Sequence, residues 1–162
     1  MEKIEGLAGL DHALGELPKA TARNSLIRAG KKALVPFLED VKAMAPVDDA
    51  ASTPERPVGA YRDSWVIGTR LNKTQAKTVR RAGKNFAEIY AGTGDPLGVL
   101  LEFGTGERTR KKSGASAGSM RAQPHGRPAW DGVKAQTLKT VGDLIWDEIY
   151  KSAKRLAAKA KR

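Results

Sequence analysis

Apolar residues in the first third of the chain recur every three or four positions, which is the spacing of amphipathic helices. Four leucines follow this spacing over residues 7–17 and predict a short helix. A second stripe extends from Pro18 to Met44 and predicts a longer helix, with proline suited to its first turn. Pro36 lies inside this second stretch and removes one helical hydrogen bond, so we expect a kink there.

After a proline-rich loop at residues 46–60, the pattern becomes that of strands. Residues 64–71, 75–82 and 86–91 resemble short strands separated by turns. The connections are too short for crossovers, so an antiparallel meander is the simplest arrangement. Residues 97–103 fit a short helix or a strand, and their length does not decide between the two.

The stretch from residue 104 to 126 is rich in Gly, Ser, Lys and Arg and has almost no large apolar side chain. We therefore predict a long loop here, mobile in the isolated subunit. A final helix is predicted from Pro128 to the high 150s, with an apolar stripe from Trp130 to Leu156. The predicted fold class is α+β: a small antiparallel sheet of three to four strands packed against two long helices, with a short N-terminal helix.

Length and composition favour one domain spanning residues 1–162. No internal repeat is seen. The chain has no cysteine, which excludes disulfides and thiolate chemistry. The first residues lack the pattern of a secretory signal, and no apolar run is long enough to span a bilayer, so we expect a soluble protein with no membrane contact.

The formal net charge is +11, and the basic residues are concentrated in three places. One lies in the middle of the chain, one in the predicted loop, and one at the basic C-terminal end, about residues 151–162. Such clusters attract polyanions or the acidic faces of partner proteins. No aromatic residues interleave them as stacking platforms, so acidic partners or solubility are favoured over direct nucleic-acid binding.

The chain shows no arrangement typical of catalysis. Its two histidines, His12 and His125, are far apart and lack the spacing of metal ligands. The glycine turns do not match a phosphate-binding loop. Glu102, flanked by apolar residues, is the one acid expected to be buried, as a structural ion-pair partner rather than a general base. We expect no enzyme activity and no cofactor.

Five short stretches, in this order, carry a resemblance to a known family: Gly6-Leu7-Ala8-Gly9-Leu10, Met44-Ala45-Pro46-Val47, Gly59-Ala60-Tyr61-Arg62-Asp63-Ser64-Trp65, Leu101-Glu102-Phe103-Gly104-Thr105-Gly106 and Gln123-Pro124-His125-Gly126-Arg127-Pro128-Ala129. The chain resembles the tail-component family of lambda-like siphophages, often called tail completion or neck proteins. It departs from the family by lacking a threonine before Gly59, by having Tyr61 in place of leucine, and by having His125-Gly126 where a phenylalanine commonly stands.

The resemblance implies a structural virion protein that forms a ring at the head–tail junction, through which DNA passes. Six copies are the family-level expectation. Its partners would be further copies of itself and other neck and tail proteins: the connector or stopper, the terminator and the tail tube. The resemblance also implies a location in the virion, after assembly in the host cytoplasm.

Two sets of residues are candidates for these contacts. The set expected to reach a neighbouring subunit or neck partner is Glu102, Phe103, Gly104, Thr105, Gly106, Arg108, Arg110, Lys111, Lys112, Arg121 and Arg127. The set expected to face DNA or an acidic partner is Arg70, Lys77, Arg80, Arg81, Lys154 and Arg155. Two alternatives remain open at this point: a tail terminator that caps the tail tube, and a basic protein that binds nucleic acid without sequence specificity.

Overall fold

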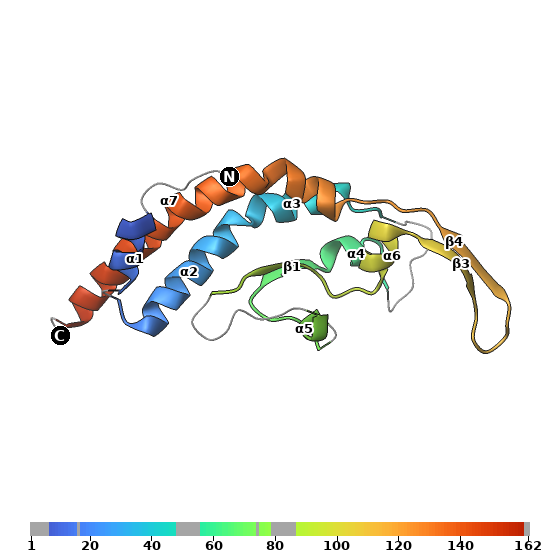
Figure 1. The fold of residues 1–162 in the computed structure, drawn as a ribbon, viewed down its shortest axis with the longest axis horizontal. Helices are drawn as coiled ribbons and strands as arrows, with labels where there is room; N and C mark the ends of the chain where they lie inside the picture. The colour runs from blue at the N-terminus through green and yellow to red at the C-terminus, as the bar shows by residue number, and fades with distance from the viewer. Residues whose placement is uncertain (1–6, 16, 48–55, 74, 79–86, 161–162) are drawn as a thin grey trace. The chain divides into compact units, whose positions relative to one another are not determined.

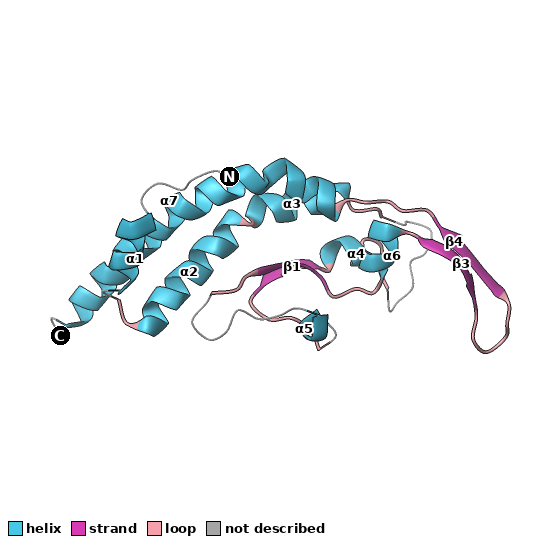
Figure 2. Cartoon of the chain, in the orientation of Figure 1, coloured by secondary structure: helices cyan, strands magenta, loops and turns pink. Residues whose placement is uncertain are grey.

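The computed structural model describes residues 7–15, 17–47, 56–73, 75–78 and 87–160 (Figure 1). The chain divides into two compact units. Unit 1 is formed by residues 1–36, 67–90 and 134–162, and unit 2 by residues 37–66 and 91–133. Helices dominate the described residues, and the strands are short (Figure 2).

Unit 1 is built on helices α1 (Leu7–Gly15), α2 (Lys19–Ala33) and most of α7 (Gly126–Ala160). Its core is small and apolar and consists of Leu17, Ala29, Ile145 and Ile149, with partly buried leucines and valines around them. These residues come from the stripes that predicted the helices. Burial of the stripes against one another is therefore what stabilises the unit.

The predicted long second helix is interrupted. Helix α2 ends at Ala33, and α3 runs from Val35 to Met44. The residue between them, Leu34, has φ −87° and ψ −3°, and its N–H still reaches the Gly30 carbonyl at 3.2 Å. Pro36 thus lies in the first turn of α3, where its missing N–H costs no hydrogen bond. The helix is thus interrupted near Pro36, where a kink was expected, but at Leu34 and without the predicted loss of a hydrogen bond.

Unit 2 contains α3 from Phe37 on, the single-turn helix α4 (Ala60–Asp63), the first half of β1 (Trp65–Gly68), and α6 (Leu97–Phe103). Its core consists of Phe37, Val41, Ala45, Tyr61, Trp65 and Ala129. The Trp65 ring meets Phe37 and Tyr61 edge to face, with ring centroids 6.2 Å and 6.5 Å away. Aromatic packing therefore supplies much of this core.

The strands form two sheets of two strands each. Strand β1 pairs with β2 (Tyr90–Thr93), and β3 (Thr105–Thr109) pairs antiparallel with β4 (Ser116–Met120). The α+β class is confirmed, but a single sheet of three to four strands is wrong. Of the strand predicted at 86–91, Tyr90 and Ala91 are in β2, residues 87–89 are not in a strand, and residue 86 lies outside the described residues.

The strand predicted at residues 75–82 is also wrong where it is described, because Gln75–Thr78 form the short helix α5; residues 79–82 lie outside the described residues. Gln, Ala and Lys are good helix formers, and so short a pattern cannot distinguish the helical spacing of apolar residues from the alternation of a strand. The ambiguous residues 97–103 are helix α6. The final helix is confirmed, and it begins at Gly126, two residues before Pro128.

The prediction of a long loop at residues 104–126 is wrong, because β3 and β4 form a hairpin there (Figure 1), whereas its mobility in the isolated subunit stays a prediction. Strand pairing requires backbone hydrogen bonds, not large apolar side chains, so a search for apolar periodicity misses it. Register shifts interrupt the ladder on either side of Arg108, and Gly118 opposite it has φ +69°. Glycine supplies this backbone conformation at little steric cost.

Candidate functional site

The root of the β3–β4 hairpin is closely packed around Gly104. This glycine has φ +69° and ψ −174°, a conformation that strongly favours glycine. A Cβ there would lie 2.7 Å from the Ala122 nitrogen and 2.8 Å from the Met120 oxygen, both backbone atoms. The Gln123 N–H also donates to the Leu101 carbonyl at 2.7 Å. The two ends of the hairpin are thus held together by backbone contacts.

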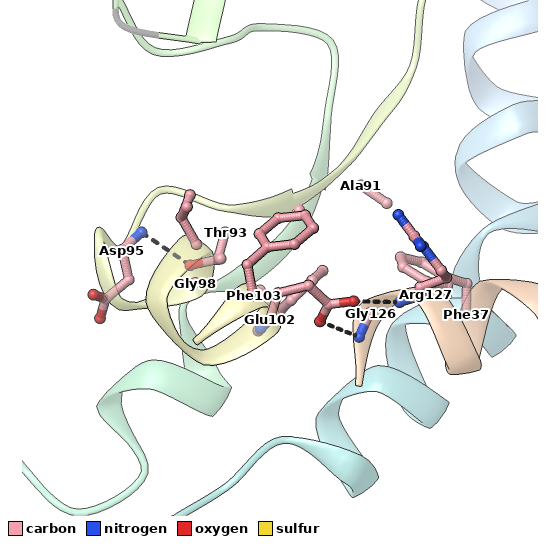
Figure 3. A pocket seen from close by; sticks show the side chains of 12 residues that line it. Phe37, Ala91, Thr93, Asp95, Gly98, Glu102, Phe103, Gly126 and Arg127 are labelled. Atoms are coloured by element: carbon pink, nitrogen blue, oxygen red, sulfur yellow. Dashed lines mark hydrogen bonds between the residues drawn. The ribbon is translucent and has the colours of Figure 1, made fainter. Parts of the chain in front are cut away.

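Glu102 lies near the end of α6, just before the hairpin, and caps α7, the helix that follows the hairpin. Its carboxylate accepts hydrogen bonds from the backbone N–H groups of His125, Gly126 and Arg127, each at 3.0 Å. Figure 3 shows the bonds from Gly126 and Arg127. These N–H groups at the start of α7 have no partner within the helix, and the helix dipole favours a negative charge there. Burial alone would raise the pKa of Glu102, but the three amide bonds outweigh it and lower the pKa. Glu102 therefore has a structural role, but backbone amides are its main partners and not the basic side chain of the predicted ion pair.

His125 is buried beside this cap, with 2% of its surface exposed. Its Nδ1 lies 2.8 Å from the Gln123 carbonyl oxygen, which only accepts, so Nδ1 carries a proton. In the neutral ring Nε2 then accepts from the Tyr61 hydroxyl at 2.7 Å. Burial raises the pKa of Tyr61, so the hydroxyl keeps the proton that it donates. The segment that leads into α7 is therefore fixed by side-chain as well as backbone bonds.

The hairpin itself extends away from α4 and α6, the helices beside it in unit 2 (Figure 1). Thr105 pairs with Met120 and Thr109 with Ser116. Residues 110–115 close the turn, with hydrogen bonds of 2.8 Å between Arg110 and Ala115 and between Gly114 and Arg110. Most hairpin side chains are exposed, and the hairpin has four basic residues and a single acid, Glu107.

One basic side chain of the hairpin has an unmet hydrogen-bonding requirement. The Nε of Arg108 is covered by neighbouring atoms but has no acceptor among the described residues. A covered donor without a partner is costly, and native proteins usually satisfy it.

The structure brings most of the first predicted set onto one continuous segment. Helix α6 ends with Glu102 and Phe103, and β3 carries Thr105, Gly106 and Arg108. The turn holds Arg110, Lys111 and Lys112. Arg121 follows β4, and Arg127 is in the first turn of α7. The second set is dispersed over separate elements and exposed: Arg70 after β1, Lys77 on α5, and Lys154 and Arg155 on α7. Arg80 and Arg81 lie outside the described residues.

Sequence reasoning missed a buried ionic cluster in unit 1. Glu148 on α7 is 3% exposed, so the prediction that Glu102 is the one buried acid is wrong. The carboxylate accepts from Lys32 Nζ and Arg28 Nε, each at 2.6 Å. Ser25 and Ser152 bond beside it at 2.9 Å. The signal was present in the sequence, since Glu148 lies three residues after Ile145, on the buried face of the helix.

In the described part of the chain, no three His, Cys, Asp or Glu residues gather in a way that could hold a metal ion. None of the described helices is both long enough and apolar enough to cross a membrane.

Comparison with known families identifies the chain. Residues 8–104 match the model of the family described as Bacteriophage HK97-gp10, putative tail-component. The match covers more than half of the 162 residues and ends at Gly104, the residue from which the hairpin begins. Comparisons with curated proteins and with solved structures found no match. The family resemblance seen in the sequence is thus confirmed, and the chain belongs to this family of bacteriophage tail components.

Proposed function

We propose that this tail component is a non-catalytic subunit of a ring at the head–tail junction, a tail completion or neck protein through which DNA passes. The observation that carries the proposal is the β3–β4 hairpin, which is anchored at its root and exposed along its length. A two-stranded hairpin with no apolar face is marginally stable alone. Its outer backbone edges and its basic turn are suited to contact with another subunit.

A hairpin that reaches the next copy would make a head-to-tail contact, because the surface that it touches differs from the hairpin itself. Contacts of this kind produce closed rings when the rotation between copies is a whole fraction of a turn. A ring of six copies agrees with the expectation for the family.

The basic groups have two roles in this proposal. Those in the turn, Arg110, Lys111 and Lys112, meet acidic surfaces of neighbouring proteins. Exposed Arg70, Lys77, Lys154 and Arg155 remain candidates for contact with passing DNA, where binding would depend on salt but not on sequence. The protein would reside in the virion after assembly in the host cytoplasm.

The proposal is tested by replacing Arg110, Lys111 and Lys112 together with alanine in the phage. These side chains are exposed, so the subunit is expected to fold, and unchanged circular dichroism would verify this. Electron microscopy of lysates should then show free heads and free tails of normal length. The matched control replaces Lys19 and Arg23 on α2, which are exposed and belong to neither candidate set.

Two outcomes would contradict the proposal. Joined particles at the wild-type yield would show that the basic turn of the hairpin is not needed for assembly. Overlong tails would assign the protein to the alternative role of a terminator. Tight, steeply salt-dependent binding of duplex DNA by the isolated subunit, with particle assembly unaffected, would instead favour the nucleic-acid-binding alternative.

A further inference from the structure

Unit 2 has an open groove beside the root of the hairpin. Its volume is about 300 Å³, and its lining is mostly apolar, from α3, β1, β2, α6 and the start of α7. Two of the lining side chains, Val99 and Phe103 on α6, are 65% and 67% exposed. Figure 3 shows Phe103 and Arg127 among the side chains that line it. Large apolar groups exposed side by side at a concave site are typical of binding surfaces.

Both acids that line this groove are already engaged by other groups. Asp95 is paired with Arg56 at 2.6 Å. The Glu102 carboxylate is used by the three amides at the start of α7. The Arg127 side chain is exposed and forms no ion pair with any described residue. The groove therefore presents one uncompensated guanidinium beside an apolar surface.

We propose that this groove binds an extended segment of a partner protein that carries a bulky apolar side chain followed, within two residues, by Asp or Glu. The apolar side chain packs on Val99 and Phe103, and the carboxylate pairs with Arg127. A volume of about 300 Å³ is at the small end of ligand pockets, which suits one anchoring side chain better than a cofactor. The planar guanidinium can bind a carboxylate through two parallel hydrogen bonds. This inference does not require that the protein form a ring.

The test uses the full chain and a display library of random short peptides. After selection on the wild-type protein, the enriched peptides should share an apolar residue followed closely by an acidic one. A synthetic copy of the most enriched peptide should bind Arg127→Gln about tenfold more weakly than wild type, because one charged hydrogen-bonded pair is lost. Binding to Phe103→Ser should be weaker still. Arg121→Gln, which removes an exposed arginine outside the groove, is the matched control and should bind normally.

A second peptide separates charge from apolar packing. Replacing the acidic residue by its amide should weaken binding to wild type but leave binding to Arg127→Gln unchanged. Enrichment without an acidic preference, or equal binding to wild type and Arg127→Gln, would overturn the proposal. Failure to select any peptide would also overturn it, and self-association that is lost in Phe103→Ser would then assign the groove to a second copy. Head–tail joining is scored separately by electron microscopy, so the two proposals can fail independently.

Discussion

Glu148 in unit 1 and Glu102 in unit 2 are both largely removed from solvent, yet they are neutralised by different groups. Lys32 and Arg28 on α2 hold Glu148 through charged side chains. Backbone amides at the start of α7 hold Glu102. Both glutamates connect α7 to an earlier segment of the chain, so each joins parts that are distant in sequence.

The difference determines how each connection responds to solution conditions. The lysine and arginine side chains are 53% and 38% exposed, so salt and water reach the cationic side of the Glu148 cluster. Amides carry no titratable charge, and they are held in place by the helix that they begin. The unit 1 cluster should therefore depend strongly on charge, and the unit 2 cap mainly on the presence of an acceptor oxygen.

The largest effect is expected from Glu148→Gln. The amide side chain removes the charge that two cations share in a nearly fully buried position. The free energy of unfolding should fall by about 2–3 kcal/mol, measured by urea denaturation at neutral pH. Glu39→Gln, at an exposed position on α3, is the control and should change stability by less than about 0.5 kcal/mol. Equal effects of the two changes would contradict the ionic role of Glu148.

Lowering the pH should reveal how much the Glu148 cluster contributes to stability without any mutation. Hydrogen bonds from Lys32 and then Arg28 lower the pKa of Glu148 from 4.5 to about 2. The folded pKa is depressed, so the stabilisation is complete above the unfolded pKa and is lost as pH falls from about 4.5 towards 2. Between about pH 6 and pH 3 the wild type should lose about 2 kcal/mol more stability than Glu148→Gln. Parallel profiles of stability against pH for wild type and Glu148→Gln would show that the ion pairs of Glu148 contribute nothing to stability.

A smaller effect is expected from Glu102→Gln. Glutamine keeps one acceptor oxygen but loses the negative charge at the start of α7, so stability should fall by about 1 kcal/mol. Hydrogen exchange should report the change locally, with faster exchange of the His125, Gly126 and Arg127 amides. Glu107→Gln on the exposed hairpin is the control. Unchanged exchange at the three amides would show that Glu102 does not cap the helix.

The smallest effect should come from salt. At high ionic strength the stability difference between wild type and Glu148→Gln should shrink by about 0.5 kcal/mol, because salt screens partly exposed cations. The corresponding difference for Glu102→Gln should change less, since amides provide most of its contacts. Both are measured by urea denaturation with and without added sodium chloride. A larger effect of salt on the stability difference for Glu102→Gln than for Glu148→Gln would contradict the contrast between the two glutamates.

The long helices could be predicted from local pattern, because each of them buries a stripe that repeats every three or four residues. The stripe ending at Leu156, the break near Pro36 and the α+β class follow from such patterns. The hairpin could not be read in this way, because its Ser, Gly and Arg residues have no apolar alternation. The family, in turn, was recognised from short stretches in a fixed order, and residues 8–104 confirm it.

The amino-acid order alone was enough to establish the long helices, the excess of basic charge and membership in a phage tail family, since these depend on composition and on neighbours along the chain. The partners of the buried groups could not be predicted from the amino-acid order. Glu102 meets His125 and Glu148 meets Arg28 across long separations in sequence, and such pairs form only when packing brings the segments together. The groove with its unpaired arginine arises for the same reason, because five separate elements contribute to it.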